Sequence, residues 1–342
     1  MEEAKSQIEN SIAQVRKRDG SISNFNTDKI LTAIYKAFSA SNKPDKELAI
    51  ELSDGVLTKL VEHGFSATNP PSVESIQDLV ESTLIDQGHS DIAKGYILYR
   101  HERRKIREEK MKVLNTKTLD SVGKSFDINC LRVLASRYLM RDNKNEINET
   151  PSELFERVAV LVAISDILRN SELFVAEGGI SQNIEEATEY LKKLDDFNYK
   201  FKIGKYYLNK WHFRCLINCY VDLANQGKMK VPFKELLTMI ASKKLDGYAD
   251  KISEYYELMV SQDFLPNSPT MMNAGGRLGQ LSACFVLAMP DDMEGIMKST
   301  SDAALIFKSG GGVGINYSEL REEGEIVAST SGVASGPVSF MN

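Results

Sequence analysis

Three features are missing from this sequence, and each absence excludes a class of protein. No apolar run among its 342 residues reaches the roughly eighteen that a membrane-spanning helix needs, and its first residues are too polar for a signal peptide. The four cysteines form no Cys-x-x-Cys pair, which argues against a zinc ribbon or a thioredoxin-type dithiol. With a net charge of −6, a nucleic-acid polymer is not an expected partner. We therefore expect a cytoplasmic protein without a membrane partner.

What is present is ordinary for a globular protein. Hydrophobic residues make up 42% of the chain and charged residues 26%, and the length suggests two or three domains. One spacing invites a metal interpretation, because His212, Cys215 and Cys219 follow one another on a predicted helix. It matches no structural-zinc spacing and has no evident fourth ligand, so buried free thiols are favoured and no metal site is expected.

The first hundred residues or so predict one small domain. Residues 1–13 are charged and are expected to form a flexible N-terminus. The next stretch predicts a β-hairpin that turns at Asp19-Gly20, followed by a helix that starts near Asp28. Apolar residues then recur at helical spacing in three further segments. These segments cover about 45–63, 73–87 (capped by Ser72) and 90–110.

Three cations gather around this hairpin and suggest a ligand. Lys17, Arg18 and Lys29 could neutralise a triphosphate, although a solvated basic strand is the simpler interpretation of these residues alone. The pattern from Val15 through Lys29 to Ala37, closed by Tyr96-x-x-Tyr99-Arg100, resembles the ATP-cone, a regulatory domain that binds ATP or dATP. That resemblance implies an ATP-cone over residues 14–105, with nucleotide contacts from Val15, Lys17, Arg18 and Lys29.

A charged segment separates this domain from the remainder of the chain. Residues 106–118 carry opposite charges four apart and are expected to form a helix end and a linker. Residues 119–260 are expected to be mostly helical. Within them, Thr150-Pro151-Ser152-Glu153 predicts a sharp helix start with a capping box.

The most informative stretch runs from Leu265 to Asn316. It sets Cys284 between an apolar run, residues 281–289, which predicts a buried strand, and two glycine-bearing turns at Gly275-Gly276 and residues 310–314. Glycine backbones can approach a ligand closely, and a row of N–H groups can bind phosphate oxygens. On spacing alone, tight strand-to-strand turns are the favoured explanation of the glycines, because the row fits no established phosphate-loop pattern.

The order of motifs in this stretch is more specific than its glycines. The segments NSPT, NAG, LSACFV, GGGVG and ASGPVSF closely resemble the first half of the catalytic domain of ribonucleotide reductases. The residues of these motifs are most similar to those of class II, the adenosylcobalamin-dependent branch. The resemblance implies an α+β fold: the helical cone, a helical middle region, and from residue 261 to 342 the first part of a ten-stranded α/β barrel.

The resemblance also assigns roles to individual residues. Cys284 matches one half of the cysteine pair that reduces the ribonucleotide. A second set matches substrate contacts: Ser268, Ser282, Ala283, Gly311 and Gly312. A third set matches the site for the deoxynucleoside triphosphate effector that selects the substrate: Asp291, Lys308 and Arg321.

The family's barrel continues beyond the point that corresponds to Asn342. Its thiyl-forming cysteine, its second reducing cysteine and its second effector loop have no counterpart in this sequence. We therefore expect that the chain alone cannot reduce nucleotides and needs a C-terminal reductase polypeptide, whether the gene is split or the sequence stops at an intein or an artificial boundary. Unpaired strand edges of an unfinished barrel would attract that polypeptide. A dithiol reductant such as a thioredoxin-like protein, and a homodimer or higher oligomer through the effector-site helices, are further implied partners.

Two alternatives remain open from the sequence. One is a class I reductase large chain, whose radical comes from a metal-bearing second subunit. The other is a free-standing sensor of ATP and dATP, for which the effector residues Asp291, Lys308 and Arg321 would have no purpose.

Overall fold

The computed structural model describes residues 12–41, 43–179, 182–196, 198, 200–327 and 331–341. The chain divides into two compact units, residues 1–119 and 120–342. Most of the expected flexible N-terminus lies outside the described residues. Ile12, near its end, is fully buried in the core of the first unit, so an apolar residue directly before the hairpin is anchored rather than frayed. Within the described ranges, no helix is both long and apolar enough to cross a membrane.

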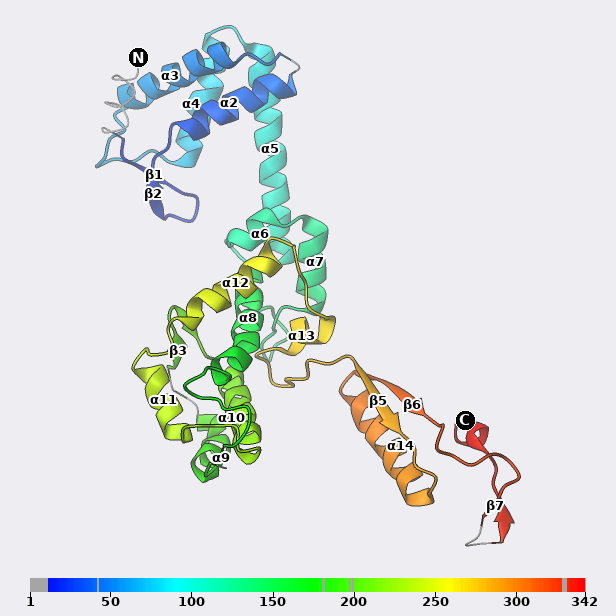
Figure 1. The fold of residues 1–342 in the computed structure, drawn as a ribbon. Coiled ribbons are helices and arrows are strands. Elements are labelled where there is room, and N and C mark those ends of the chain that lie inside the picture. Colours follow the sequence, from blue (N-terminus) through cyan, green and yellow to red (C-terminus); the bar gives the residue numbers. More distant parts are fainter. Residues whose placement is uncertain are drawn as a thin grey trace. The chain divides into compact units, whose positions relative to one another are not determined.

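The described residues of the first unit form a hairpin and four helices, as the sequence predicts (Figure 1). Strands β1 (Gln14–Arg16) and β2 (Ile22–Asn24) pair antiparallel, with Val15 opposite Ser23. Apolar stripes of the helices then share one core, which includes Ile34, Leu52 and Leu84. The helices are α2 (Asp28–Ala40), α3 (Lys46–Glu62), α4 (Val73–Asp86) and α5 (Ser90–Val113).

Helix α5 runs further than the sequence predicts. It continues to Val113 and takes up most of the segment that we expected to be a linker. Pairs of opposite charge on one helix face, such as Arg104 and Glu108 at 3.9 Å, favour continued helix over an open linker. Only six residues, 114–119, separate the end of α5 from the boundary between the units.

The helical part of the second unit is built around α8 (Pro151–Leu168). As predicted, Thr150 and Glu153 form a capping box at its start, and its side chains are buried on nearly every face. Helices α10 and α12 pack against it. The elements up to this point are α6 (Ser121–Ser125), α7 (Ile128–Arg137), α8, α9 (Glu185–Lys192), η1 (Leu194–Asp196), β3 (Lys202–Ile203), β4 (Tyr206–Tyr207), α10 (Lys210–Asn225), α11 (Phe233–Ala241), α12 (Tyr248–Val260) and α13 (Ser268–Asn273).

The last part of the chain contains a parallel strand pair. Strand β5 (Cys284–Ala288) leads through α14 (Met293–Lys308) into β6 (Gly312–Asn316), and α14 packs on both strands (Figure 1). The short elements β7 (Ile326–Val327), β8 (Gly332–Val333) and η2 (Pro337–Phe340) follow. The predicted α+β class is confirmed: the described chain is mostly helical, and its strands form two-stranded sheets rather than a closed barrel.

Candidate functional site

In the first unit, the hairpin and the helices enclose a cavity of about 290 Å³. Three of the four residues that the sequence singles out here line it: Val15, Lys17 and Lys29. The remaining lining combines side-chain amides with apolar groups, which suits a ligand that has both a polar end and a flat apolar ring. It includes Asn24, Phe25, Asn26, Ile30, Ile76, Gln77, Val80 and Tyr96.

The hairpin is fixed to the helices by local chemistry. Gly20 adopts a left-handed φ of 83° in the turn, and the Asp19 carboxylate accepts hydrogen bonds from the backbone and hydroxyl of Ser21. The backbone N–H of Arg16 donates to the Pro71 carbonyl, directly before the cap of α4. The basic strand is therefore held beside α4 rather than free in solvent.

Arg18, the fourth predicted residue, contacts the cavity only indirectly. Its guanidinium donates to the Glu74 carboxylate and, at 3.0 Å, to the side-chain oxygen of Gln77, which lines the cavity. The Arg18 and Glu74 side chains are 38% and 47% exposed, so this ion pair is worth little and can open for a stronger anion. Burial raises the pKa of Tyr96 to about 12, so its ring faces the cavity uncharged.

In the second unit, the NSPT motif forms the start of α13. Asn267 caps the helix by accepting from the Thr270 N–H at 2.9 Å, and the Thr270 hydroxyl donates to the Leu281 carbonyl at 3.0 Å. Ser268 is the first residue of α13, its side chain is exposed, and its hydroxyl lies 3.0 Å from that of Tyr138. Two of the motif's polar residues thus hold the backbone, while Ser268 faces outward.

The Gly275-Gly276 turn approaches protein, which corrects our interpretation that it approaches a ligand. Gly275 is buried with φ at +62°, and a side chain there would collide with His212 and Arg157. Its carbonyl accepts a hydrogen bond from the Asn209 side chain at 3.0 Å. Glycine is required here because a helix-borne histidine and arginine occupy the space that a Cβ would need.

Arg157 and His212 form a buried polar cluster under this turn. Arg157 is 6% exposed and is held by the Glu149 carboxylate through two hydrogen bonds, of 2.6 and 3.1 Å. His212 accepts from the Asn209 N–H at Nδ1, so the proton is on Nε2, which donates to the Arg157 carbonyl at 2.9 Å. Burial lowers the pKa of His212 to about 4, so the ring is neutral at physiological pH.

That arrangement also bears on the metal interpretation of His212, Cys215 and Cys219. Both ring nitrogens of His212 are engaged within the protein, so the ring cannot serve as a metal ligand without breaking these bonds. The two sulfur atoms lie 3.8 Å apart on α10, half-buried. The arrangement fits free thiols on a helix face.

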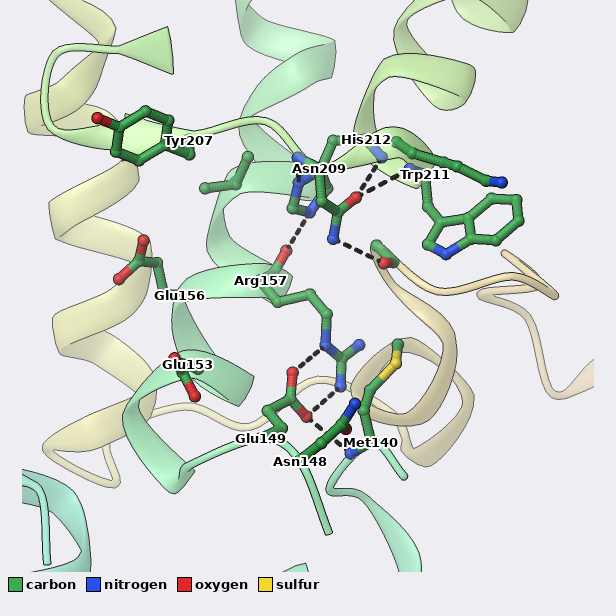
Figure 2. A pocket seen from close by; sticks show the side chains of 13 residues that line it. Met140, Asn148, Glu149, Glu153, Glu156, Arg157, Tyr207, Asn209, Trp211 and His212 are labelled. Atoms are coloured by element: carbon green, nitrogen blue, oxygen red, sulfur yellow. Dashed lines mark hydrogen bonds and ion pairs between the residues drawn. The ribbon is translucent and has the colours of Figure 1, made fainter. Parts of the chain in front are cut away.

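A second cavity, of about 510 Å³, lies beside this cluster (Figure 2). Figure 2 shows the Glu149 carboxylate facing the Arg157 guanidinium, and it shows Glu153, Glu156 and Tyr207 among the other side chains that line the cavity. No motif in the sequence predicts this cavity. Its lining comes from residues more than a hundred positions apart, such as Glu149 and Gly275, and the only local signal is the capping box at Glu153.

The structure corrects the prediction of a buried strand around Cys284. Side chains of β5 alternate between exposed and half-buried, and Val286 is 81% exposed. The sheet has one face under α14 and one open face, on which Cys284, Val286 and Ala288 lie. An alternating pattern of this kind is typical of a strand covered on one side only.

The residues opposite Cys284 leave that open face unobstructed. Gly312 pairs with Cys284 and Gly314 pairs with Val286, so no side chain of β6 stands beside the thiol until Asn316. Neither glycine has a positive φ, and a Cβ on either would meet no atom closer than 3.7 Å. These two glycines are therefore not required by the backbone, and what they provide is room next to the sulfur atom.

The predicted substrate contacts lie at this end of the sheet, but their amides are partly occupied. The Gly312 N–H donates to the Ala283 carbonyl at 2.7 Å, and the Gly311 N–H donates to the Ile306 carbonyl at 3.1 Å. Ser282 is exposed directly before Ala283. The N–H groups of Gly311 and Gly312 are therefore already paired within the protein, whereas the Ser282 hydroxyl remains accessible, and the substrate contacts of these residues stay a prediction.

Two of the three predicted effector residues are brought together. The Arg321 guanidinium donates to the Asp291 carboxylate at 2.7 Å, and both side chains are about one-third exposed (29% and 34%). Lys308 ends α14, whereas Asp291 lies just before its start. A helix of sixteen residues is about 24 Å long, so Lys308 of the same chain is far from the Asp291–Arg321 pair.

Comparison with known protein families agrees with this arrangement. Three family models match in order: the ATP cone domain over residues 13–105, the ribonucleotide reductase all-alpha domain over 124–279 and the ribonucleotide reductase barrel domain over 282–342. The chain belongs to the ribonucleotide reductase family, of which it carries an ATP cone, the all-alpha domain and the first part of the barrel domain.

Individual relatives narrow this further. A vitamin B12-dependent ribonucleoside-diphosphate reductase of Thermoplasma acidophilum is 38% identical over 335 residues, covering 96% of this chain and 40% of the relative. An enzyme of the same name from Mycobacterium tuberculosis is 29% identical over 96% of this chain and 35% of its own length. A ribonucleoside-diphosphate reductase subunit alpha of Chlamydia trachomatis is 24% identical, over 96% and 38%. The chain thus spans about 40% or less of these relatives, and the higher identities fit a class II N-terminal part.

Proposed function

We propose that this chain forms the regulatory and first catalytic part of a ribonucleoside-diphosphate reductase of the cobalamin-dependent type. The observation that carries the proposal is Cys284, an exposed thiol on the open face of the β5–β6 sheet with two glycines beside it. The relatives from Thermoplasma acidophilum and Mycobacterium tuberculosis carry this activity in their names.

The chemistry proposed for Cys284 is the supply of reducing equivalents. Replacing the 2′-hydroxyl of a ribonucleotide by hydrogen releases water and consumes two electrons and two protons, which two thiols supply when they join in a disulfide. Cys284 would provide one sulfur atom and the remaining barrel the other, since the described thiols of Cys130, Cys215 and Cys219 are half-buried on helices. The open face gives a ribose room to approach the sulfur atom.

We propose further roles in substrate binding, effector binding and ATP binding for the residues that the sequence singled out. Ser268 and Ser282 present exposed hydroxyls to the substrate. Asp291 and Arg321 form one part of an effector site, to which Lys308 would have to come from a second copy of the chain. In the first unit, the cavity lined by Val15, Lys17 and Lys29 would take ATP or dATP, with Arg18 released from Glu74 by the phosphates.

The cobalamin is proposed on narrower grounds. Adenosylcobalamin is proposed from the names of the relatives and from the resemblance of the motifs to class II, and no step above depends on it. A dithiol reductant would restore the Cys284 thiol after each turnover.

The test is deoxynucleotide formation from ribonucleoside diphosphates with adenosylcobalamin and a dithiol. This chain would be assayed alone and mixed with a polypeptide that carries the remainder of the barrel. Activity only in the mixture, lost in Cys284→Ser and kept in the control Cys130→Ser, is expected. Equal activity without adenosylcobalamin, but with a metal-bearing second subunit, would move the assignment to class I.

A further inference from the structure

Ser268 is not the only hydroxyl at the start of α13. The Tyr138 hydroxyl lies 3.0 Å from the Ser268 oxygen, although 130 positions separate the two residues in the sequence. Tyr138 follows α7 directly as its C-cap, and its side chain is half-buried, whereas Ser268 is exposed. The exposed hydroxyl therefore has a partner that is better fixed than itself.

One buried cation holds both partners in place. The Arg157 guanidinium donates to the Tyr138 carbonyl at 3.4 Å, to the Met271 carbonyl in α13 at 3.5 Å, and to the Ala274 carbonyl just after α13. Two bonds to Glu149 fix the guanidinium itself. The segment with Tyr138 and the segment with Ser268 are thus tied to the same group, and the distance between their hydroxyls is set by buried structure.

The number of hydroxyl protons determines the direction of the Tyr138–Ser268 hydrogen bond. Each hydroxyl has a single proton, so if the bond between the two hydroxyls is kept while Ser268 donates to a ligand, Tyr138 must donate to Ser268. In the resulting chain, Tyr138 O–H donates to Ser268 Oγ, and Ser268 O–H donates to an acceptor outside. Hydrogen bonds arranged head to tail in this way strengthen one another, and an anionic acceptor such as a phosphate oxygen gains most.

We propose that Tyr138 is a positioning residue for the substrate phosphates, which it orients Ser268 to bind. The proposal rests on the proposed function, in which Ser268 contacts the ribonucleotide. It adds a residue from the helical domain to that contact, and it gives the buried Arg157–Glu149 pair a purpose beyond stability.

The test uses the reductase assembled from this chain and the polypeptide that completes the barrel. Tyr138→Phe removes one hydroxyl and keeps the ring, so we expect KM for the ribonucleotide to rise about 5- to 10-fold while kcat stays within about twofold. Tyr256→Phe is the matched control, because this tyrosine is also half-buried, lies on α12 and lines neither cavity, and it should leave both constants unchanged.

Two further measurements separate positioning from a merely structural role. On a Ser268→Ala background, Tyr138→Phe should raise KM no further, because its partner is gone. Inhibition by a nucleoside, which has no phosphate, should be equal in wild type and Tyr138→Phe, whereas inhibition by the nucleoside diphosphate should weaken. An unchanged KM, or the same increase on both backgrounds, would overturn the proposal.

Direct nucleotide binding distinguishes this inference from the proposed function. If the assembled protein makes no deoxynucleotide but binds ribonucleoside diphosphate in a manner that Tyr138→Phe weakens, the reductase assignment fails and the role of Tyr138 stands. If the wild-type assembly makes deoxynucleotide but shows no preference for the diphosphate over the nucleoside, the role of Tyr138 fails and the reductase assignment stands.

Discussion

The Gly275 turn and strand β6 of the second unit use the same residue type for opposite purposes. At Gly275 the absent side chain lets the backbone pack against His212 and Arg157 in the buried cluster. At Gly312 and Gly314 the absent side chains leave an open face beside Cys284, and no backbone strain demands them. A glycine can therefore indicate either close packing, where a side chain would collide, or open space beside a functional group. Only the surrounding residues distinguish the two cases.

The largest effect on stability is expected for Arg157, one of the two residues against which Gly275 packs. Arg157→Met would leave the Glu149 carboxylate buried without its partner and should lower the free energy of unfolding of the second unit by about 3–5 kcal/mol. Trp211 is the single tryptophan of the chain, so its fluorescence in a urea titration reports this unit alone. Recovery of part of the loss in Arg157→Met/Glu149→Gln would confirm the mechanism, and a loss below about 1 kcal/mol would contradict it.

Gly275→Ala tests this close packing directly. A left-handed φ costs an alanine about 1–2 kcal/mol, and overpacking against His212 and Arg157 adds about 1–3 kcal/mol. Gly312→Ala is the matched control, since its Cβ would meet no atom closer than 3.7 Å, and it should change the free energy of unfolding by less than about 0.5 kcal/mol. Equal destabilisation by both substitutions would contradict the distinction between the Gly275 turn and strand β6.

The neutral histidine under Gly275 predicts a pH dependence. His212 has a folded-state pKa of about 4 against an ordinary value of 6.5, so the unfolded state binds the proton more readily between these values. The stability of the second unit should therefore fall as pH decreases from 6.5 to 4, by about 3 kcal/mol over the full range. His212 is the only histidine in this unit.

The comparison for this pH effect is His212→Gln, which cannot titrate. The variant should be less stable than the wild type at pH 7. Between pH 6.5 and 5, where carboxylates contribute least, its free energy of unfolding should no longer fall with pH as that of the wild type does. Urea titrations at several pH values, followed by Trp211 fluorescence and far-ultraviolet circular dichroism, would measure this. Parallel pH profiles for the two proteins would mean that the histidine is not the group responsible.

The smallest change in stability is expected for Gly312→Ala, on the open face beside Cys284, and this substitution should still change activity clearly. If the proposed reductase assembly is correct, Gly312→Ala puts a methyl group beside Cys284 and should lower kcat/KM by about tenfold or more, because it would obstruct the approach of the ribose to the thiol. Steady-state kinetics on the folded variant would measure this. Wild-type activity in Gly312→Ala would show that the space beside the thiol is not used.

Local sequence signals predicted most elements of the fold. The hairpin turn at Asp19-Gly20, the Ser72 cap and the capping box at Thr150 all depend on residues within four positions of one another, and the structure confirms them. Contacts between distant segments were not predictable in this way. The partners of Gly275 are Arg157 and His212, and no local pattern connects these three residues.

The candidate sites show the same division. Val15, Lys17 and Lys29 lie close in sequence, and they do line one cavity. Lys308 was grouped with Asp291 and Arg321 by resemblance, but the length of α14 separates it from them. The exposure of β5 was mispredicted because an apolar run alone does not reveal how many faces of a strand are covered.

The register between β5 and β6 has a consequence for insertions and deletions. Side chains alternate between the two faces of a strand, so a change of one residue in the connection between Lys308 and Gly312 would reverse every position of β6. Val313 and Ile315 would then stand beside Cys284, and the glycines would face α14. We therefore expect this short connection to tolerate substitutions far better than any change in its length.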